Sequence, residues 1–265
     1  MFYAFLFNKY DRTTLRLLAD REIKARVIGT HLGLGHYVVM PVLMLLVYTF
    51  VFSVVFSVRW PGTIDSFSGF ALRVFAGLIP FQFFAEVVNR APGLVLENSV
   101  YVKKVVFPIE TLVPTTVVVA LFSSLMTFIV FLASYFCSYG LPTVTALWVI
   151  TLWPPLILIT VGLGWILASL GVFLRDLRHL VSILTSVMIF LAPIFYPIAM
   201  VPKAFEALIF ANPLSYLIEA MRGALFDDVA PSLIVLSVYY FGGFGLAQLG
   251  YWVFMRTKKA FADVI

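Results

Sequence analysis

Six long apolar runs divide the sequence, and they limit its possible folds more than any other feature. A helix needs about 20 apolar residues to cross the hydrocarbon core of a bilayer, because each residue adds about 1.5 Å along its axis. In lipid the backbone must satisfy its own hydrogen bonds, which a helix does. We therefore expect an all-α integral membrane protein, formed by residues 1–265 as a single transmembrane domain. Its six transmembrane helices are predicted at residues 35–58, 70–88, 109–138, 143–173, 180–198 and 231–255.

The composition excludes an ordinary soluble domain. Hydrophobic residues make up 62% of the chain and charged residues only 12%, whereas soluble domains carry about 25% charged residues. Cys137 is the only cysteine, which excludes an internal disulfide and a metal site made of cysteines. The basic segment after residues 1–7 has no small-residue cleavage site, and we expect no cleaved signal peptide.

The basic residues lie mainly on one side of the predicted topology. They precede the first run, follow the second and fourth runs, and end the chain, at Lys9, Arg12, Arg16, Arg21, Lys24, Arg26, Arg90, Lys103, Lys104, Arg175, Arg178, Arg256, Lys258 and Lys259. Cytoplasmic loops carry the excess of Lys and Arg in membrane proteins, so both termini are predicted to be cytoplasmic. The net charge of +5 then reflects topology and attraction to anionic membrane lipids, with no nucleic-acid partner.

Residues 11–28 have the pattern of an amphipathic helix. Leu15, Ala19, Ile23 and Val27 recur at steps of four, while Arg12, Arg16 and Lys24 occupy the opposite stripe. Such a helix would lie along the membrane surface with its cations near phosphates. The alternative is a soluble helix that only obeys the charge rule.

The connection between the fifth and sixth runs is too apolar for a solvated loop. Its two apolar segments, residues 204–210 and 214–225, are each too short to span. Prolines delimit them, because proline is tolerated at a helix start and disfavours helix in the preceding residue. We expect an outer re-entrant helical hairpin at residues 202–226, in which Glu219 and Arg222 could pair with each other or with a neighbour.

The sequence contains no motif for catalysis or ATP hydrolysis. It lacks a phosphate-binding loop and a nucleophile elbow, and His31, His36 and His179 lack metal-ligand spacing. Arg73, Glu86 and Glu110 lie near the ends of predicted spans, where their side chains could reach the interface. Without a chain of ionisable groups in the membrane interior, proton coupling is disfavoured, and the work is expected to come from a partner.

Residues 94–105 offer a place for that partner. They mix charged and apolar side chains after Ala91-Pro92-Gly93 and could form a short amphipathic helix across the cytoplasmic face. Such an element can fit a cleft in a moving ATPase domain and pass its displacement to the spans. An ordinary loop with topology-setting lysines is the alternative.

Several segments then resemble one family in order along almost the whole chain. They are residues 20–26 (DREIKAR), 98–108 (NSVYVKKVVFP), 171–178 (GVFLRDLR), 192–197 (APIFYP) and 212–222 (NPLSYLIEAMR). Together they resemble ABC-2 type permeases that export O-antigen, capsule or teichoic-acid polysaccharide. His36 departs from the pattern, because relatives commonly carry Trp near this position.

The resemblance implies a permease subunit rather than an enzyme, acting in lipopolysaccharide biosynthesis at the bacterial inner membrane. It implies a dimer with a second copy of the chain and two copies of a separate ABC nucleotide-binding subunit. ATP and Mg would bind that subunit, so no cofactor is expected in this chain. The substrate would be a polyprenyl-diphosphate-linked glycan, exported from the cytoplasm.

The resemblance also assigns roles to residues. The coupling helix at residues 94–105 would engage the ATPase through Leu94, Glu97, Asn98, Tyr101, Lys103 and Lys104. Arg175 and Asp176 fall in the signature of a cytoplasmic loop. The outer gate would use Pro197, Pro202, Asn212, Pro213, Glu219 and Arg222. Candidate pathway-lining aromatics are Tyr37, Tyr48, Phe52, Phe56, Phe190, Phe195 and Tyr196, which could instead pack internally or face lipid.

Two further hypotheses concern the membrane surface and helix packing. Arg12, Arg16 and Lys24 could guide the diphosphate headgroup, because cations attract phosphate strongly at a low-dielectric boundary. The spacings Gly29/Gly33 and Gly164/Ala168 could allow close helix contacts. The competing functions are an ABC-2 exporter of drugs or small lipophiles and an ATPase-independent channel or carrier.

Overall fold

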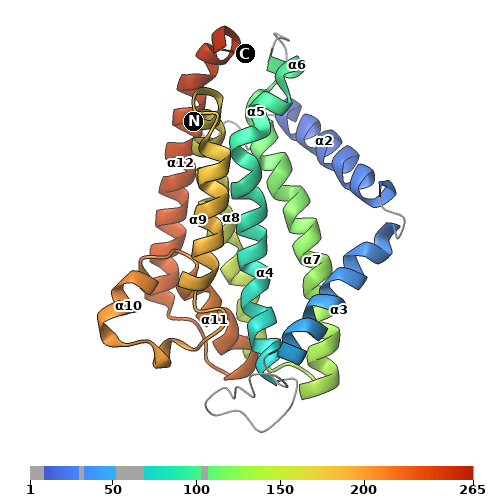
Figure 1. Ribbon diagram of the computed structural model, residues 1–265, viewed down its shortest axis with the longest axis vertical. Helices are drawn as coiled ribbons and strands as arrows, with labels where there is room; N and C mark the ends of the chain where they lie inside the picture. The colour runs from blue at the N-terminus through green and yellow to red at the C-terminus, as the bar shows by residue number, and fades with distance from the viewer. Residues whose placement is uncertain (1–8, 30–32, 52–68, 103–106, 265) are drawn as a thin grey trace.

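The computed structural model describes residues 9–29, 33–51, 69–102 and 107–264 (Figure 1). Throughout these ranges the regular elements are helices, and no strand occurs in them. The prediction of an all-α chain is confirmed for this part of the sequence. The described helices extend mostly along one direction, with shorter elements at the two ends of the bundle.

Four helical stretches are long and apolar enough to cross a membrane. Their main helices are α4 (Gly69–Arg90), α7 (Leu112–Tyr139), α8 (Trp148–Phe173) and α12 (Leu233–Val264). Short 3-10 turns begin two of the stretches, namely η4 (Ile109–Thr111) before α7 and η5 (Val144–Leu147) before α8. The multi-pass membrane character inferred from hydropathy therefore rests on at least these four helices.

Two shorter apolar helices correspond to the first and fifth predicted spans. α3 (His36–Tyr48) continues as helix to Val51, and the rest of the predicted run, residues 52–58, lies outside the described residues. α9 (Leu177–Leu191) ends seven residues before the predicted limit at residue 198. Proline disfavours helix in the residue before it, and Ala192, which precedes Pro193, adopts an extended ψ of 143°. The count of six spans remains a prediction.

α4 is the central helix and α12 a peripheral one. The most apolar window of α4 is 83% buried within the chain, against 22% for that of α12. α4 packs against α7, α8, α9 and α11 (Ser215–Phe226), while α12 runs along α8 (Figure 1). Large side chains such as Phe75, Phe83 and Trp165 fill the space between these helices, and van der Waals packing of this kind holds membrane helices together.

Glycines bring α8 and α12 into close contact. A Cβ atom added to Gly162 would lie 2.6 Å from the Leu246 backbone, and one added to Gly250 would lie 2.2 Å from the Gly162 carbonyl oxygen. Small residues allow such backbone approach in membrane helices. Gly164, which was also predicted to allow a close helix contact, lies against Val113 of α7 within the same chain. Gly33 has φ +54° in a turn, so Gly29 and Gly33 do not share one helix face.

The remaining elements collect at opposite ends of the bundle. One end holds α2 (Lys9–Ile28), η3 (Ala91–Gly93), α5 (Leu94–Glu97), α6 (Ser99–Val102) and the C-terminal end of α12. The other end holds α10 (Lys203–Phe210) and α11 (Figure 1). We call these the α5 end and the α11 end. The segments predicted to be cytoplasmic thus lie together, away from the predicted outer hairpin.

Candidate functional site

The segment after α4 contains two short helices rather than the single helix predicted at residues 94–105. Asn98 separates α5 from α6 with a non-helical φ of −109° and ψ of 27°. Its side-chain Nδ2 donates a hydrogen bond to the Leu94 carbonyl at 2.8 Å, and Asn side chains often end a helix in this way. Lys103 and Lys104 lie outside the described residues, as does the side chain of Tyr101.

This coupling segment, defined as residues 91–102, packs directly on α8. A Cβ atom on Gly171 would lie only 2.0 Å from the Pro92 carbonyl oxygen, so glycine is needed for the two backbones to touch. Leu94 and Val95 are buried beside this contact. Close-packed interiors transmit strain, and a displacement of the segment would therefore press on α8.

A polar contact joins the same segment to α9. Glu97 Oε1 lies 2.9 Å from Arg178 Nη1, in a pair that is about half exposed to solvent. Asp176 precedes α9, and its backbone carbonyl accepts hydrogen bonds from the amides of His179 and Leu180. Arg175 is exposed in the same turn. The sequence pointed to residues 171–178 as a motif, but it did not reveal that Gly171 and Arg178 contact the coupling segment.

Four charged residues link α2 to α4 near the α5 end. Arg26 Nη1 lies 2.6 Å from Glu86 Oε1, and Arg90 Nη1 lies 2.6 Å from Glu22 Oε1. Arg26 Nη2 also lies 3.5 Å from Glu22 Oε1. The expectation that Glu86 merely reaches toward the interface is therefore wrong, because its carboxylate is paired. We call these four residues the inner charge cluster.

Glu110, which was also expected to reach toward the membrane interface, is paired as well. Its Oε2 accepts a hydrogen bond from Lys258 Nζ at 2.6 Å, and the Glu110 side chain is only 11% exposed. The Trp165 indole donates to the Glu110 carbonyl at 3.1 Å. The ion pair therefore joins the beginning of the α7 stretch to the last turns of α12.

The predicted headgroup residues lie together on α2. Arg12, Arg16 and Lys24 are all exposed, and Lys24 Nζ pairs with Asp20 at 2.7 Å. Ala19, on the predicted apolar stripe, is buried. The arrangement leaves a basic stripe accessible along the helix, as an interfacial helix requires.

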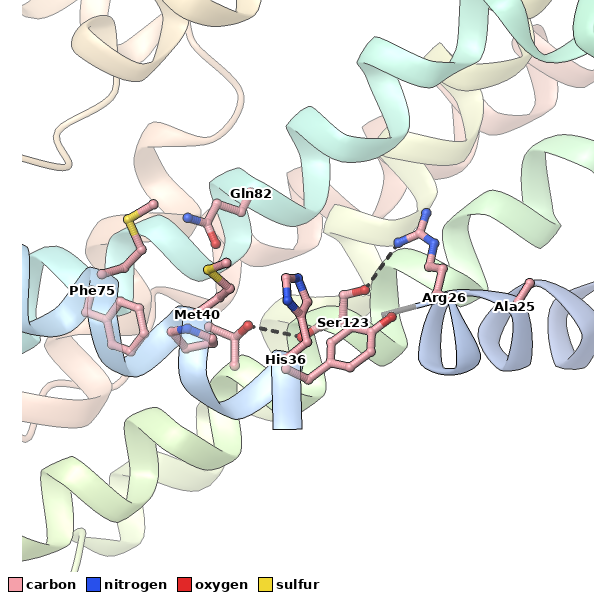
Figure 2. Close-up of a pocket in the computed structure, with 12 residues that line it drawn as sticks. Ala25, Arg26, His36, Met40, Phe75, Gln82 and Ser123 are labelled. Atoms are coloured by element: carbon pink, nitrogen blue, oxygen red, sulfur yellow. Dashed lines mark hydrogen bonds between the residues drawn. The ribbon is translucent and has the colours of Figure 1, made fainter. Parts of the chain in front are cut away.

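A cavity of about 560 Å³ lies between α2, α3, α4 and α7 (Figure 2). Arg26 and His36 line it together with the polar side chains of Gln82 and Ser123. Its apolar wall is made by Tyr37, Met40, Pro41, Met44, Phe75 and other side chains. The cavity therefore offers both polar and apolar surface. In the described ranges no three potential metal ligands come together.

The structure brings four of the predicted pathway aromatics together. Tyr48 and Phe195 have ring centroids 6.4 Å apart, and Phe190 and Phe195 are 5.9 Å apart. The Tyr196 hydroxyl donates to the Phe190 carbonyl at 2.9 Å. Tyr37 lies elsewhere and packs on Phe122 of α7. Phe52 and Phe56 lie outside the described residues.

A second charged cluster holds α11 in place at the opposite end. The Arg222 side chain is 1% exposed and donates to the backbone carbonyls of Arg73, Pro193 and Ile194, the first at 2.8 Å. Glu219 Oε1 lies 3.5 Å from Arg222 Nη1. Three carbonyl oxygens and one carboxylate thus surround the buried guanidinium.

Arg73 completes this outer charge cluster, defined as Arg73, Glu219, Arg222 and Asp227. Its guanidinium donates two hydrogen bonds to the Asp227 carboxylate, at 2.6 and 3.0 Å, and lies over the Phe226 ring at 4.9 Å. The expectation that Arg73 reaches toward the interface is wrong, because its side chain is 7% exposed and paired. Bidentate arginine–carboxylate pairs are among the stronger charge-assisted contacts.

The other predicted gate residues shape turns around this cluster. The Pro197 carbonyl accepts from the Met200 amide, and the Pro202 carbonyl accepts from the Phe205 amide at the start of α10. Asn212 Oδ1 accepts from the Leu214 amide at 3.0 Å, next to Pro213. These contacts lie in the turns before α10 and between α10 and α11.

Comparison with known proteins gives one consistent result. The sequence model described as ABC-2 type transporter matches residues 13–226. The chain is 29% identical to "O-antigen export system permease protein RfbA" of Klebsiella pneumoniae, over 95% of the chain and 94% of that protein. It is 28% identical to the protein of the same name from Myxococcus xanthus, over 96% of each. With "Polysialic acid transport protein KpsM" of Escherichia coli it shares 27% identity, over 81% of the chain and 82% of that protein.

Proposed function

Because the chain belongs to the ABC-2 type transporter family, we propose that it is the membrane permease subunit of an ATP-driven polysaccharide exporter. It moves a lipid-linked glycan from the cytoplasm across the bacterial inner membrane. The observation that carries this proposal is the likeness to permeases named for O-antigen export, which extends over almost the full length of both chains.

The proposal assigns ATP hydrolysis to a separate ABC nucleotide-binding subunit, which also holds Mg. The coupling segment supports this division, because it sits at one end of the bundle and bears on α8 through Gly171 and on α9 through Arg178. A partner that pushes on α5 and α6 moves both helices. Packed elements of this kind convert a local displacement into a shift of whole helices.

The proposed topology has six spans, with α3 and α9 completing the four longer helices. The α5 end faces the cytoplasm together with both termini, and α10 and α11 form the outer re-entrant hairpin. The positive-inside rule supports this orientation. Exposed apolar side chains on α10, such as Phe205, Leu208 and Phe210, suit the outer leaflet.

A second copy of the chain is part of the proposal. α3 and α9 both present exposed apolar side chains on flanks of α4, including Leu43, Leu46, Val47, Ile183, Leu184 and Val187. These faces suit contact with a second copy, and the glycan path then runs between the two copies. The cluster of Tyr48 on α3, Phe190 on α9, and Phe195 and Tyr196 in the turn after α9 supplies aromatic faces for sugar rings.

The proposal is tested in cells that lack this chain and in membranes that contain it with its ATPase. Re-expression should restore glycan at the cell surface, and purification of the chain should bring an ABC ATPase with it. Lipid-linked glycan should stimulate hydrolysis of ATP by this complex. Stimulation by small lipophiles without any effect of glycan would favour a drug exporter, and a lack of any ATPase would contradict the proposal.

A further inference from the structure

The contact between α2 and α4 is made by charged side chains across a gap. α2 packs mainly against α7. Cavities of about 560 and 290 Å³ lie on either side of the inner charge cluster, the first lined by Arg26 and the second by Glu22 and Arg90. Figure 2 shows Arg26 extending from α2 toward the Ser123 side chain at the edge of the larger cavity. The cluster therefore bridges a space that apolar packing leaves open.

The four charges are arranged in complementary order. Glu22 and Arg26 are four residues apart on α2, and Glu86 and Arg90 are four residues apart on α4. Arg26 pairs with Glu86 and Glu22 with Arg90, each at 2.6 Å. The two helices therefore present the same acid–base pair in opposite directions, and each positive charge meets a negative one.

The exposure of these side chains suits a contact that holds and also rearranges. Each of the four is between 25% and 33% exposed. Pairs at this depth are screened less than surface pairs, yet water can replace a partner more readily than in a buried cluster. The contact is thus strong enough to orient α2 and accessible enough to change during a transport cycle.

The α4 side of the cluster is joined directly to the coupling segment. Arg90 is the last residue of α4, and η3 begins at Ala91 without a break in the helical path. A displacement of α5 therefore moves Arg90 and Glu86 along with it. Through their partners, the same displacement reaches α2.

We propose that Glu22, Arg26, Glu86 and Arg90 are positioning residues that make the interfacial helix α2 follow the coupling segment. The role in transport rests on the function proposed above, whereas the mechanical link is a property of this chain alone. When the segment moves, α2 moves with it, and the walls of both flanking cavities shift. The ATPase stroke thereby reaches the surface on which an amphiphilic substrate approaches.

Charge exchange tests the proposal without changing net charge. The double variant E22R/R26E, or the double variant E86R/R90E, places like charges opposite each other between the helices. Each double variant should reduce glycan export by about tenfold or more at equal membrane levels, because facing like charges are strongly unfavourable. The fourfold variant restores opposite charges in reversed order and should recover most of the export. Asp20→Asn, which removes an exposed ion pair from the same helix, serves as the control.

A distance measurement separates the mechanical link from the transport function. Spin labels are placed at Leu17 on α2 and Val100 on α6, which are 65% and 68% exposed, in a Cys137→Ser background and diluted with unlabelled chain. The parent and the fourfold variant should give the same narrow distance distribution, and each twofold variant a broader or shifted one. Equal distributions in all variants, or a fourfold variant that remains as altered as the twofold ones, would overturn the proposal. If the distances differ among the variants as expected but the parent chain exports no glycan, the proposed function fails while the mechanical link stands.

Discussion

The two charge clusters contain the same kinds of residue but hold the protein in different ways. Each has two arginines and two carboxylates, and each joins elements that are far apart in the sequence. In the outer cluster the arginine side chains are 1% and 7% exposed, whereas in the inner cluster they are 29% and 33% exposed. Depending on burial, similar charged residues can thus either fix a fold or leave a contact free to change.

Desolvation explains the contrast. A buried guanidinium has lost its water, so every donor must find an acceptor inside the protein. Arg222 does so on three backbone carbonyls, which ties α11 to α4 and to the turn after α9. The side chains of the inner cluster are 25–33% exposed, so breaking a pair there costs less. We therefore expect the α11 end to be static and the α5 end to be adjustable.

The largest effect is expected from removing the buried arginine. Arg222→Met should destabilise the protein by about 3–5 kcal/mol, because it leaves the Arg73, Pro193 and Ile194 carbonyls without their donor and Glu219 without its partner. Thermal unfolding in detergent measures the change. Arg256→Met is the control, since Arg256 is exposed and lies over Trp252. Equal unfolding temperatures for the two variants would show that the outer cluster does not fix the fold.

A smaller effect is expected where the coupling segment meets α8. Gly171→Ala places a Cβ atom against the Pro92 backbone, which cannot rotate away, and overpacking of this kind costs about 1–3 kcal/mol. Because the segment must shift, ATP hydrolysis should continue while glycan export falls. Gly242→Ala is the matched control, since its Cβ meets no atom within 4 Å. Normal export by the Gly171 variant would argue against force passing through this contact.

Gly77 on α4 tests how tightly the outer charge cluster holds the Arg222 side chain. A Cβ atom at this position would lie 2.8 Å from Arg222 Nη2 and 3.1 Å from the Ile218 side chain. Gly77→Ala should therefore displace the guanidinium and destabilise the protein by about 1 kcal/mol, toward the low end for overpacking because side chains can move. The comparison of unfolding temperatures should place this variant between Gly242→Ala and Arg222→Met. A variant as stable as the parent would show that Arg222 is not held tightly.

The smallest effect on stability is expected at the inner cluster. Arg26→Gln removes the partner of Glu86, yet both side chains are partly exposed, so the loss should be about 1 kcal/mol or less. Export should nevertheless fall more than stability, because α2 loses one of its two ion pairs to α4. The ratio of export to folded protein in the membrane checks this. An export defect that only matches the loss of folded protein would reduce the cluster to a stabilising contact.

Run length and charge placement predicted the long helices well, because a membrane span depends on local composition. They did not predict the end of α9 at Leu191 or the break at Asn98, each of which depends on a single residue's backbone preference. The i, i+3 spacing indicated that Glu219 and Arg222 could pair, and they do, but the pairs between distant residues were not predicted. Arg73 and Asp227 are 154 residues apart, and no local pattern relates them. The motif containing Gly171 was visible, but its contact with Pro92 depends on tertiary packing.

In this mechanism the ATPase acts at the α5 end, while the α11 end stays fixed on the other side of the membrane. Cross-linking and labelling check both ends, with Val100→Cys on α6 or Lys203→Cys at the start of α10 in a Cys137→Ser background, since both positions are exposed. Val100→Cys should cross-link to the nucleotide-binding subunit, and Lys203→Cys should react only with reagents added from outside the cell. A cross-link from Lys203→Cys to the ATPase, or labelling of Val100→Cys from outside, would contradict this mechanism.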